Sequence, residues 1–341
     1  MPSYNRILVI KLKQPGDVLV SSPVLAALKE AWPQARVTYM VPRGTEEMIA
    51  DHPLLDGLLV VDRGPETWSE RLRFVRTLRA QRFDLVLELS SGDRGAIYAW
   101  LSGAKVRLGF FRPGKAFWQP FAFTAQMPLP PLQMHMVRHN LELLRLLGLE
   151  PPAHPRLEFF WSPEAEARVQ ELLHSLELDG APFAVMHPGA GWRFKCWTPA
   201  GYARVIEAEL LAAIREECRV KPVDLAGRLT LKELGALIAR ARFFFRVGSA
   251  PMHLAAAVNT PSVALFGPSG DFNLGALGRG PPGNQKGLGL HPLRQGRLSG
   301  LQDQPLPHRN DPGGSASSCG SAFRVLEEKG GRPWPESWVT A

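Results

Sequence analysis

Cysteine is scarce in this chain. Its 341 residues include three cysteines, Cys196, Cys218 and Cys319, and these lie far apart in the sequence. Three scattered thiols are too few for the disulfide framework of a small secreted protein, and they lack the paired spacing of a zinc site. The pattern excludes both classes, and no redox role follows from it.

Long apolar runs are also missing. The longest are of strand length, and the one near the N-terminus is broken by Lys11 and Lys13. A membrane-spanning helix needs about 20 apolar residues, and a signal peptide needs an unbroken apolar stretch of roughly 7 to 15. We therefore expect a cytoplasmic protein without a signal peptide. Its length allows two ordinary domains, and 45% hydrophobic with 21% charged residues is typical of a soluble globular protein.

Signatures of nucleotide cofactors and of nucleic-acid binding are weak. No Walker A sequence is present, and the G-x-G-x-x-G match at residues 278–283 follows no expected strand and contains two prolines, which lack amide hydrogens. The net charge of +8 arises from basic residues spread through the expected helices and loops, not gathered in a stripe. We expect no nucleic-acid partner. The phosphates of a glycolipid or of a membrane would fit the charge as well.

What the sequence does contain is a regular alternation of strand and helix patterns. The first series has strands at residues 6–12, 35–41, 58–61 and 83–89 and helices at 22–31, 66–80 and 134–147. A second series follows, with a strand at 183–187, helices at about 199–218 and 231–241, and a strand, helix, strand unit at 243–266. Such alternation predicts an α/β protein with two doubly wound parallel sheets. We place the boundary between the two domains near residues 160–180.

The unit at 243–266 carries the first candidate site. A Gly-Ser turn follows its first strand, and small residues at 255–257 let its helix lie close to the sheet. In such units an anion is held at the carboxyl end of a strand by loop amides and the N-terminus of the next helix. Ser249 and His253 would stand there. The alternative is a buried unit in which His253 merely packs or caps.

Two further loops join a strand to a helix and carry candidate residues. In the first, Asp17 lies at or just before a helix N-terminus, where it is either an N-cap or a carboxylate base. In the second, residues 187–195, glycines expose backbone amides and Lys195 could neutralise a departing diphosphate. The alternative for this second loop is a flexible segment with a solvated lysine.

Several segments together resemble glycosyltransferase family nine, the lipopolysaccharide heptosyltransferases, and most closely the heptosyltransferase III type. They are RILVIKLKQPGDVLVSSPVLAALKEAWP, FDLVLELSSGDRGA, AVMHPGAGWRFKCWTP, VDLAGRLTLKELGALIARA and SAPMHLAAAVNTPSVALFGPSG. The resemblance implies a GT-B fold with two Rossmann-like domains facing a cleft. Residues 1–165 would bind the acceptor and residues 180–273 the nucleotide-sugar donor.

The resemblance also implies roles for individual residues. Asp17 would be the catalytic base that takes a proton from the acceptor sugar, and this outweighs its interpretation as a cap. The donor phosphates would be held by Gly189, Ala190, Lys195, Ser249, Ala250 and His253. The reaction would be an inverting transfer of heptose from ADP-heptose to a lipopolysaccharide inner-core acceptor, without a metal or other cofactor. Peripheral contact with the inner membrane surface is a further expectation.

Three departures from the family pattern support an alternative, a catalytically impaired remnant that still binds nucleotide or glycolipid. Similar proteins carry an aspartate where this chain has Gly248, and they have a strand and turn that this chain skips near Glu209. The third departure is residues 274–320, which contain 11 glycines and 6 prolines. We expect this stretch to be irregular. A one-base shift after Asn273 would allow a cysteine-bearing sequence like that of the family, which suggests a frameshift and leaves residues 321–341 as a C-terminal remnant.

Overall fold

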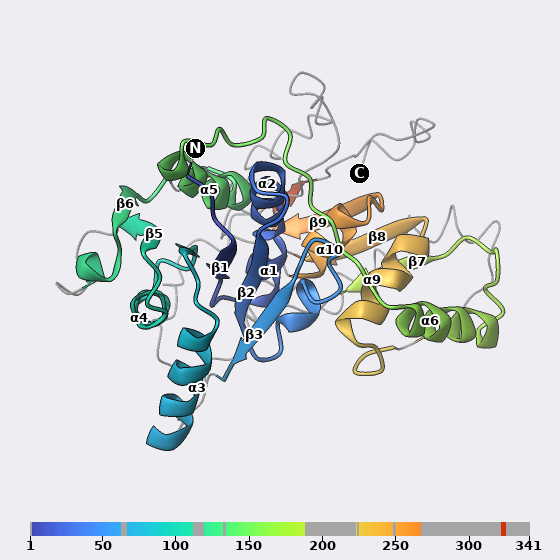
Figure 1. Ribbon diagram of the computed structural model, residues 1–341. Coiled ribbons are helices and arrows are strands. Elements are labelled where there is room, and N and C mark those ends of the chain that lie inside the picture. The colour runs from blue at the N-terminus through green and yellow to red at the C-terminus, as the bar shows by residue number, and fades with distance from the viewer. Residues whose placement is uncertain are drawn as a thin grey trace, which may run out of the picture.

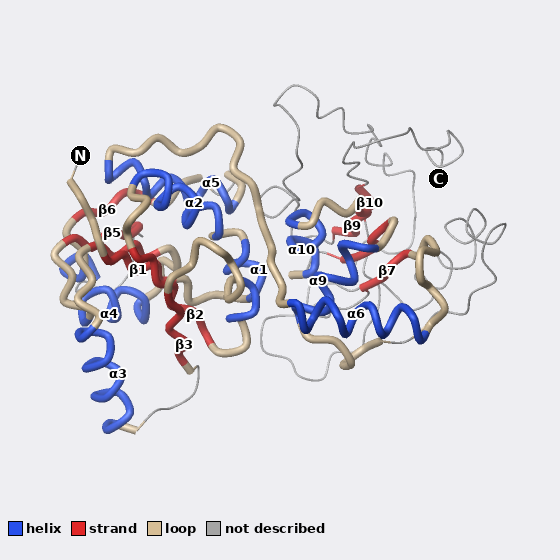
Figure 2. Tube along the Cα trace, turned by 45° about the vertical axis from the view of Figure 1, so that its right-hand side comes forward, coloured by secondary structure: helices blue, strands red, loops and turns tan. Residues whose placement is uncertain are grey.

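The computed structural model describes residues 2–62, 67–111, 119–131, 134–187, 223, 225–247, 250–266 and 322–324. These residues form two sheets that lie side by side, one of six strands and one of four, each with helices packed against it (Figures 1 and 2). Within the described residues, no helix is long and apolar enough to cross a membrane.

The first sheet is parallel throughout and has β1 near its centre. Its strands, in spatial order, are β3 (Gly57–Val61), β2 (Arg36–Pro42), β1 (Arg6–Ile10), β4 (Leu85–Glu88), β5 (Val106–Phe111) and β6 (Ala125–Pro128). Four consecutive residues of β1, from Ile7 to Ile10, are fully buried. A parallel strand covered on both faces needs such an unbroken apolar run, since its side chains alternate between the faces.

Helices cover both faces of this sheet, so it is doubly wound. Ile7 and Val9 point into one apolar cluster with α1 (Pro15–Leu19), α2 (Ser22–Ala31), α5 (Met136–Glu142) and the short helices η1 (Glu46–Met48) and η3 (Leu143–Leu147). Leu8 and Ile10 point into the opposite cluster with α3 (Trp68–Ala80), α4 (Asp93–Leu101) and η2 (Gln119–Ala122). The alternation along one strand thus builds two cores.

The second sheet contains three parallel strands, β7 (Ala184–His187), β8 (Phe243–Val247) and β9 (Ser262–Phe266), with β8 in the middle. A fourth strand, β10 (Ala322–Arg324), pairs antiparallel with β9. Helices α6 (Pro163–Ser175) and α9 (Leu231–Arg240) pack together through Val169, Leu173, Ala236 and Leu237. Helix α10 (Pro251–Ala257) connects β8 to β9.

The predicted alternation is confirmed wherever the structure describes it. Each strand and helix expected there is present within a few residues of its expected bounds, apart from residues 134–147, which divide into α5 and η3. The structure adds α1, α4, β5, β6, α6 and β10, which the sequence pattern did not reveal. The expected helix at 199–218, the skipped strand near Glu209 and the tail at 274–320 lie outside the described residues.

Helix α10 joins the two sheets. All seven of its residues are buried, and its start lies against α1. A Cβ added to Gly16 of α1 would lie 2.9 Å from Cδ2 of His253 and 3.3 Å from Cα of Ala250. The apolar cluster around β1, α1 and α2 continues into α10, and it also includes Phe244 of β8 and Ile238 of α9. A glycine at position 16 allows this close approach of the two helices.

A polar contact joins the two sheets at a second place. The ammonium group of Lys232, at the start of α9, lies 2.9 Å from Oδ2 of Asp51 and donates to the carbonyl oxygen of Phe160 at 2.6 Å. The amide of Lys232 also donates to Oε2 of Glu47 at 3.2 Å. Because Asp51 and Glu47 follow β2, this lysine ties α9 to the first sheet.

Candidate functional site

Asp17 is the third residue of α1, at the carboxyl end of β1. The helix begins at Pro15 after Gln14, which occupies the N-cap position, and no side chain caps it. The capping alternative for Asp17 is therefore wrong. Its half-buried carboxylate lies in the first turn of a helix that contacts α10, which leaves the carboxylate available for chemistry.

Buried polar side chains hold α1 in place, because a five-residue helix is not stable alone. Lys11, which is 1% exposed, donates from Nζ to the Leu89 carbonyl at 3.0 Å and to Oδ1 of Asn140 at 2.8 Å. Asn140 in turn donates from Nδ2 to the carbonyl oxygen of Val20 at 3.1 Å, which caps the end of α1. This network fixes the helix that carries Asp17 to β4 and α5.

Lys11 remains a cation at neutral pH in spite of its burial. Desolvation lowers the pKa of Lys11 to about 8, while the negative charges of Asp17 and Glu88 act in the opposite direction. The charges of these two carboxylates therefore favour a protonated lysine at this edge of the sheet.

Glu88 organises the loop between β4 and α4. Its carboxylate accepts hydrogen bonds from the amides of Ser90 at 2.8 Å and Ser91 at 2.9 Å, and Ser91 has a left-handed φ of 55°. Burial raises the pKa of Glu88 to about 6, against the effect of these hydrogen bonds. A Cβ at Gly95 would lie 2.1 Å from Oε1 of Glu88, so glycine is required there.

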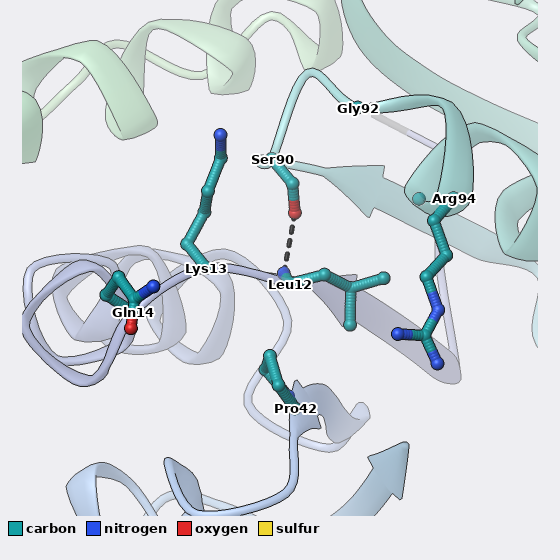
Figure 3. Close-up of a pocket in the computed structure, with 8 residues that line it drawn as sticks. Leu12, Lys13, Gln14, Pro42, Ser90, Gly92 and Arg94 are labelled. Atoms are coloured by element: carbon teal, nitrogen blue, oxygen red, sulfur yellow. Dashed lines mark hydrogen bonds between the residues drawn. The ribbon is translucent and has the colours of Figure 1, made fainter. Parts of the chain in front are cut away.

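A cavity of about 300 Å³ opens beside these two loops, and it is lined by Leu12, Lys13, Gln14, Pro42, Ser90, Gly92, Arg94 and Gly95. The Leu12 amide donates to Oγ of Ser90 at 2.6 Å, which joins the β1 and β4 loops across it (Figure 3). Arg94 donates to the Asp62 carbonyl and lies over the ring of Tyr98, 5.6 Å from its centroid. Lys13 and Arg94 supply the charges of the lining, so the cavity suits an anionic group.

The structure brings two of the predicted donor residues, Ala250 and His253, against the helix that bears Asp17. His253 is 3% exposed, and burial lowers its pKa to about 3, with smaller effects of the positive Arg246 and of His135. Its Nδ1 has no hydrogen-bond partner among the described residues. A neutral imidazole can exchange a hydrogen bond with a ligand, but it cannot supply positive charge. Gly189, Ala190, Lys195, Gly248 and Ser249 lie outside the described residues.

The prediction from sequence missed several polar residues of the site. Arg246, in β8, is completely buried and donates from Nη2 to Oγ of Ser262 at 3.2 Å. Lys11, Glu88, Asn140 and Arg94 were missed as well. A charged residue within or directly after an apolar strand, as at Arg246, Glu88 and Lys11, was the available signal. The described residues contain no group of three or more histidine, cysteine or acidic side chains that could hold a metal ion.

Comparison with known proteins gives consistent results. The sequence model for "Glycosyltransferase family 9 (heptosyltransferase)" matches residues 71–210 and 206–281. Lipopolysaccharide heptosyltransferase 3 of Escherichia coli is 31% identical over 278 residues, which cover 74% of this chain and 80% of that protein. Its counterpart in strain K12 is 28% identical over 278 residues, covering 74% and 79%.

Solved structures show the same fold. A glycosyltransferase family 9 protein of Veillonella parvula superposes with a TM-score of 0.70 at 24% identity, covering 80% of this chain and 84% of that one. The E. coli ADP-heptose lipopolysaccharide heptosyltransferase II superposes with a TM-score of 0.65 at 22% identity, covering 80% and 88%. The expected GT-B arrangement of two Rossmann-like sheets is thereby confirmed.

Proposed function

The chain belongs to glycosyltransferase family 9, the heptosyltransferases, and from that premise we propose that it transfers heptose from ADP-heptose to a heptose of the lipopolysaccharide inner core. The relatives named lipopolysaccharide heptosyltransferase 3 support this choice of acceptor. The observation that carries the proposal is the contact of α1 with α10, which brings the helix bearing Asp17 against Ala250 and His253.

The two halves of the chain would divide the substrates between them. We assign the acceptor to residues 1–165 and the donor to residues 180–273. The cavity with Lys13 and Arg94 supports the first assignment, because two cations at a cavity wall would attract an acceptor that bears anionic groups. The carboxyl end of β8 supports the second, since parallel sheets bind ligands at this edge.

In the proposed reaction, Asp17 accepts the proton of the acceptor hydroxyl as the oxygen attacks the anomeric carbon of the heptose. The bond from that carbon to the ADP oxygen breaks on the opposite face, and ADP leaves with the electron pair, which inverts the configuration. A base at the correct distance contributes about 10²- to 10⁴-fold to such a step. The fixed attachment of α1 through Lys11 and Asn140 supports Asp17 in this role, because orientation of the base determines its efficiency.

The departing ADP carries negative charge that the donor loops would stabilise. Lys195 would supply the positive charge, and the amides of Gly189, Ala190, Ser249 and Ala250 would donate hydrogen bonds. His253 would contribute one hydrogen bond from its neutral ring. This assignment includes no metal ion. The enzyme would act in the cytoplasm, in peripheral contact with the inner membrane that holds its acceptor.

A second candidate is a remnant that binds nucleotide or glycolipid without turnover. The observation that favours it is Gly248, where similar proteins carry an aspartate. Restoring that side chain with Gly248→Asp should strengthen donor binding or raise turnover if the position matters. An unchanged affinity for ADP-heptose together with unchanged turnover would remove this argument for a remnant.

The direct test is turnover of ADP-heptose with a truncated core acceptor. Asp17→Asn should lower kcat by about 100-fold or more and leave ADP affinity nearly unchanged. Lys195→Ala should weaken ADP binding by about 1.5 to 3 kcal/mol in calorimetry, the amount expected for a lost charged hydrogen bond. ADP binding by the unaltered protein without any heptosylated product would favour the remnant.

A control variant separates catalysis from helix stability. Glu164→Gln removes an exposed carboxylate from the first turn of α6, as Asp17→Asn does in α1. Both variants should retain the melting temperature, and only Asp17→Asn should lose turnover. A loss of activity that tracks a loss of stability in Asp17→Asn would make the carboxylate structural.

A further inference from the structure

Helix α3 extends away from the body of the first sheet, on the side far from the second sheet (Figures 1 and 2). A capping box fixes its start: the Thr67 hydroxyl accepts from the Glu70 amide at 3.3 Å, and the Glu70 carboxylate accepts from the Thr67 amide at 2.8 Å. Every residue from Trp68 to Arg73 is exposed, and Leu78 is the one fully buried side chain of the helix. The first two turns thus form without packing on the core.

The exposed turns carry apolar and basic side chains together. Trp68 is 85% exposed and Leu72 is 52% exposed, and they lie on one face because they are four residues apart. The guanidinium of Arg71 lies 5.4 Å from the centroid of the Trp68 ring. Between residues 68 and 82 the chain has five arginines and one glutamate. An exposed tryptophan and leucine among arginines are typical of a helix that lies in a lipid–water interface.

The neighbouring elements α4 and η2 also expose large aromatic side chains. Helix α4 exposes Trp100 to 58%, and η2 exposes Phe121 to 76%. The ring of Phe74 in α3 packs against Tyr98 in α4, with centroids 5.3 Å apart. The guanidinium of Arg94 lies over the ring of Tyr98, and Arg94 lines the cavity beside the β1 loop. A short chain of packed side chains therefore connects the exposed helix to the candidate acceptor cavity.

We propose that the exposed face of α3 is a docking surface for an anionic phospholipid bilayer. Arg73 and Arg76 contact headgroup phosphates, and Trp68 and Leu72 enter the boundary between the headgroups and the acyl chains. The occupant follows from the charge, since five arginines near one glutamate favour a negatively charged surface. The surface would hold the acceptor cavity close to a membrane-anchored acceptor, and in this respect the inference rests on the proposed function.

Flotation of the full chain with lipid vesicles tests the docking surface directly. The probes are phosphatidylcholine vesicles with and without about 30 mol% phosphatidylglycerol, at about 50 mM and about 500 mM NaCl. The protein should float with the anionic vesicles at low salt and should dissociate at high salt. Absence of flotation, or equal binding to neutral vesicles, would overturn the proposal.

Paired variants locate the surface. Arg73→Gln with Arg76→Gln should weaken vesicle binding by about 25-fold, at about fivefold per arginine near the surface. Arg228→Gln with Arg242→Gln removes two exposed charges beside the second sheet and should leave binding unchanged. Trp68→Ser with Leu72→Ser should weaken binding by about tenfold or more and reduce its persistence at high salt. Equal effects of the two arginine pairs would make the binding non-specific and refute a role for α3.

Further measurements distinguish other outcomes. Circular dichroism and melting temperature should be unchanged in all variants, because the substituted side chains are exposed. Light scattering should show the same particle mass with and without Trp68→Ser; a change in mass would assign the face to a second copy of the chain and overturn the membrane proposal. Membrane binding and heptosyl transfer can be tested separately. The vesicle assay contains neither donor nor acceptor, so vesicle binding can be observed even if heptosyl transfer fails. Turnover of a soluble acceptor should be normal in the α3 variants.

Discussion

Lowering the pH from about 7 to about 5.5 should destabilise the protein, because three buried histidines must charge when it unfolds. His52 and His139 have pKa values lowered to about 4 by burial, with smaller effects of Lys232 and Lys11 respectively. Burial lowers the pKa of His253 to about 3, and Arg246 and His135 act in the same direction. All three are less than a tenth exposed.

The sign of the effect follows from proton binding. Between about pH 4 and the unfolded value of about 6.5, the unfolded chain binds more protons than the folded one, so stability falls as the pH falls. Each histidine contributes a loss of about 1 kcal/mol between pH 7 and 5.5. Glu88, with its pKa raised to about 6, takes up its proton first in the folded state and offsets less than about 1 kcal/mol of that loss. The net loss is about 2 to 3 kcal/mol, a large share of a typical stability of about 5 to 15 kcal/mol.

Urea unfolding at the two pH values measures this loss. With a slope of about 3 kcal/mol per molar urea, the midpoint should fall by about 1 M. His139→Gln should remove about a third of the pH dependence, because one of the three neutral rings is gone. His154→Gln, at an exposed position, should leave the pH dependence unchanged. A midpoint that does not move between pH 7 and 5.5 would refute the burial of neutral histidines.

Three substitutions test the packing around Asp17. Gly16→Ala should lower both stability, by about 1 to 3 kcal/mol, and turnover, since the new methyl group would lie 2.9 Å from His253; urea unfolding and kcat measure the two effects. Gly95→Ala should cost about 1 to 3 kcal/mol, because the Glu88 carboxylate must leave its position against the Ser90 and Ser91 amides. The control is Gly92→Ala, where a Cβ meets nothing within 4 Å. Asn140→Ala should cost about 1 to 3 kcal/mol and lower kcat without changing ADP affinity, because Lys11 loses one of its two hydrogen-bond acceptors and α1 loses its cap. An unchanged kcat would show that α1 does not need this support.

The sequence predicted the elements whose pattern is local. Strand β1 is an unbroken apolar run and helix α9 has clear apolar periodicity, and α9 begins with the capping box of Thr230 and Glu233. Strand β6 was missed because its four residues are only partly buried or exposed, so the apolar signal is weak. Helix α6 has a detectable signal, Ser162 and Pro163 followed by Ala165, Val169 and Leu173 at helical spacing, but it follows a proline-rich loop and was not recognised.

The candidate site was only partly predictable for the same reason. Asp17 could be located at the carboxyl end of the first strand because an apolar strand, a glycine-containing segment and a helical pattern follow one another in the chain. The hydrogen bonds that hold α1 in place could not be predicted, since Lys11 and Asn140 are 129 positions apart in the sequence. The neutral state of His253 was also unpredictable, because it depends on burial against α1 of the other sheet.

The complete burial of α10 has a consequence for the cooperativity of the molecule. One apolar cluster runs from β1 through α1 to α10 and Phe244. If either sheet were expressed as a separate fragment, the apolar side chains that it contributes to this cluster would be exposed to water. Neither fragment would keep its helices in place, because α1 is too short and α10 too apolar to stand in water. The two sheets are therefore one thermodynamic unit, and heat or denaturant should unfold them in a single step despite their separate architectures.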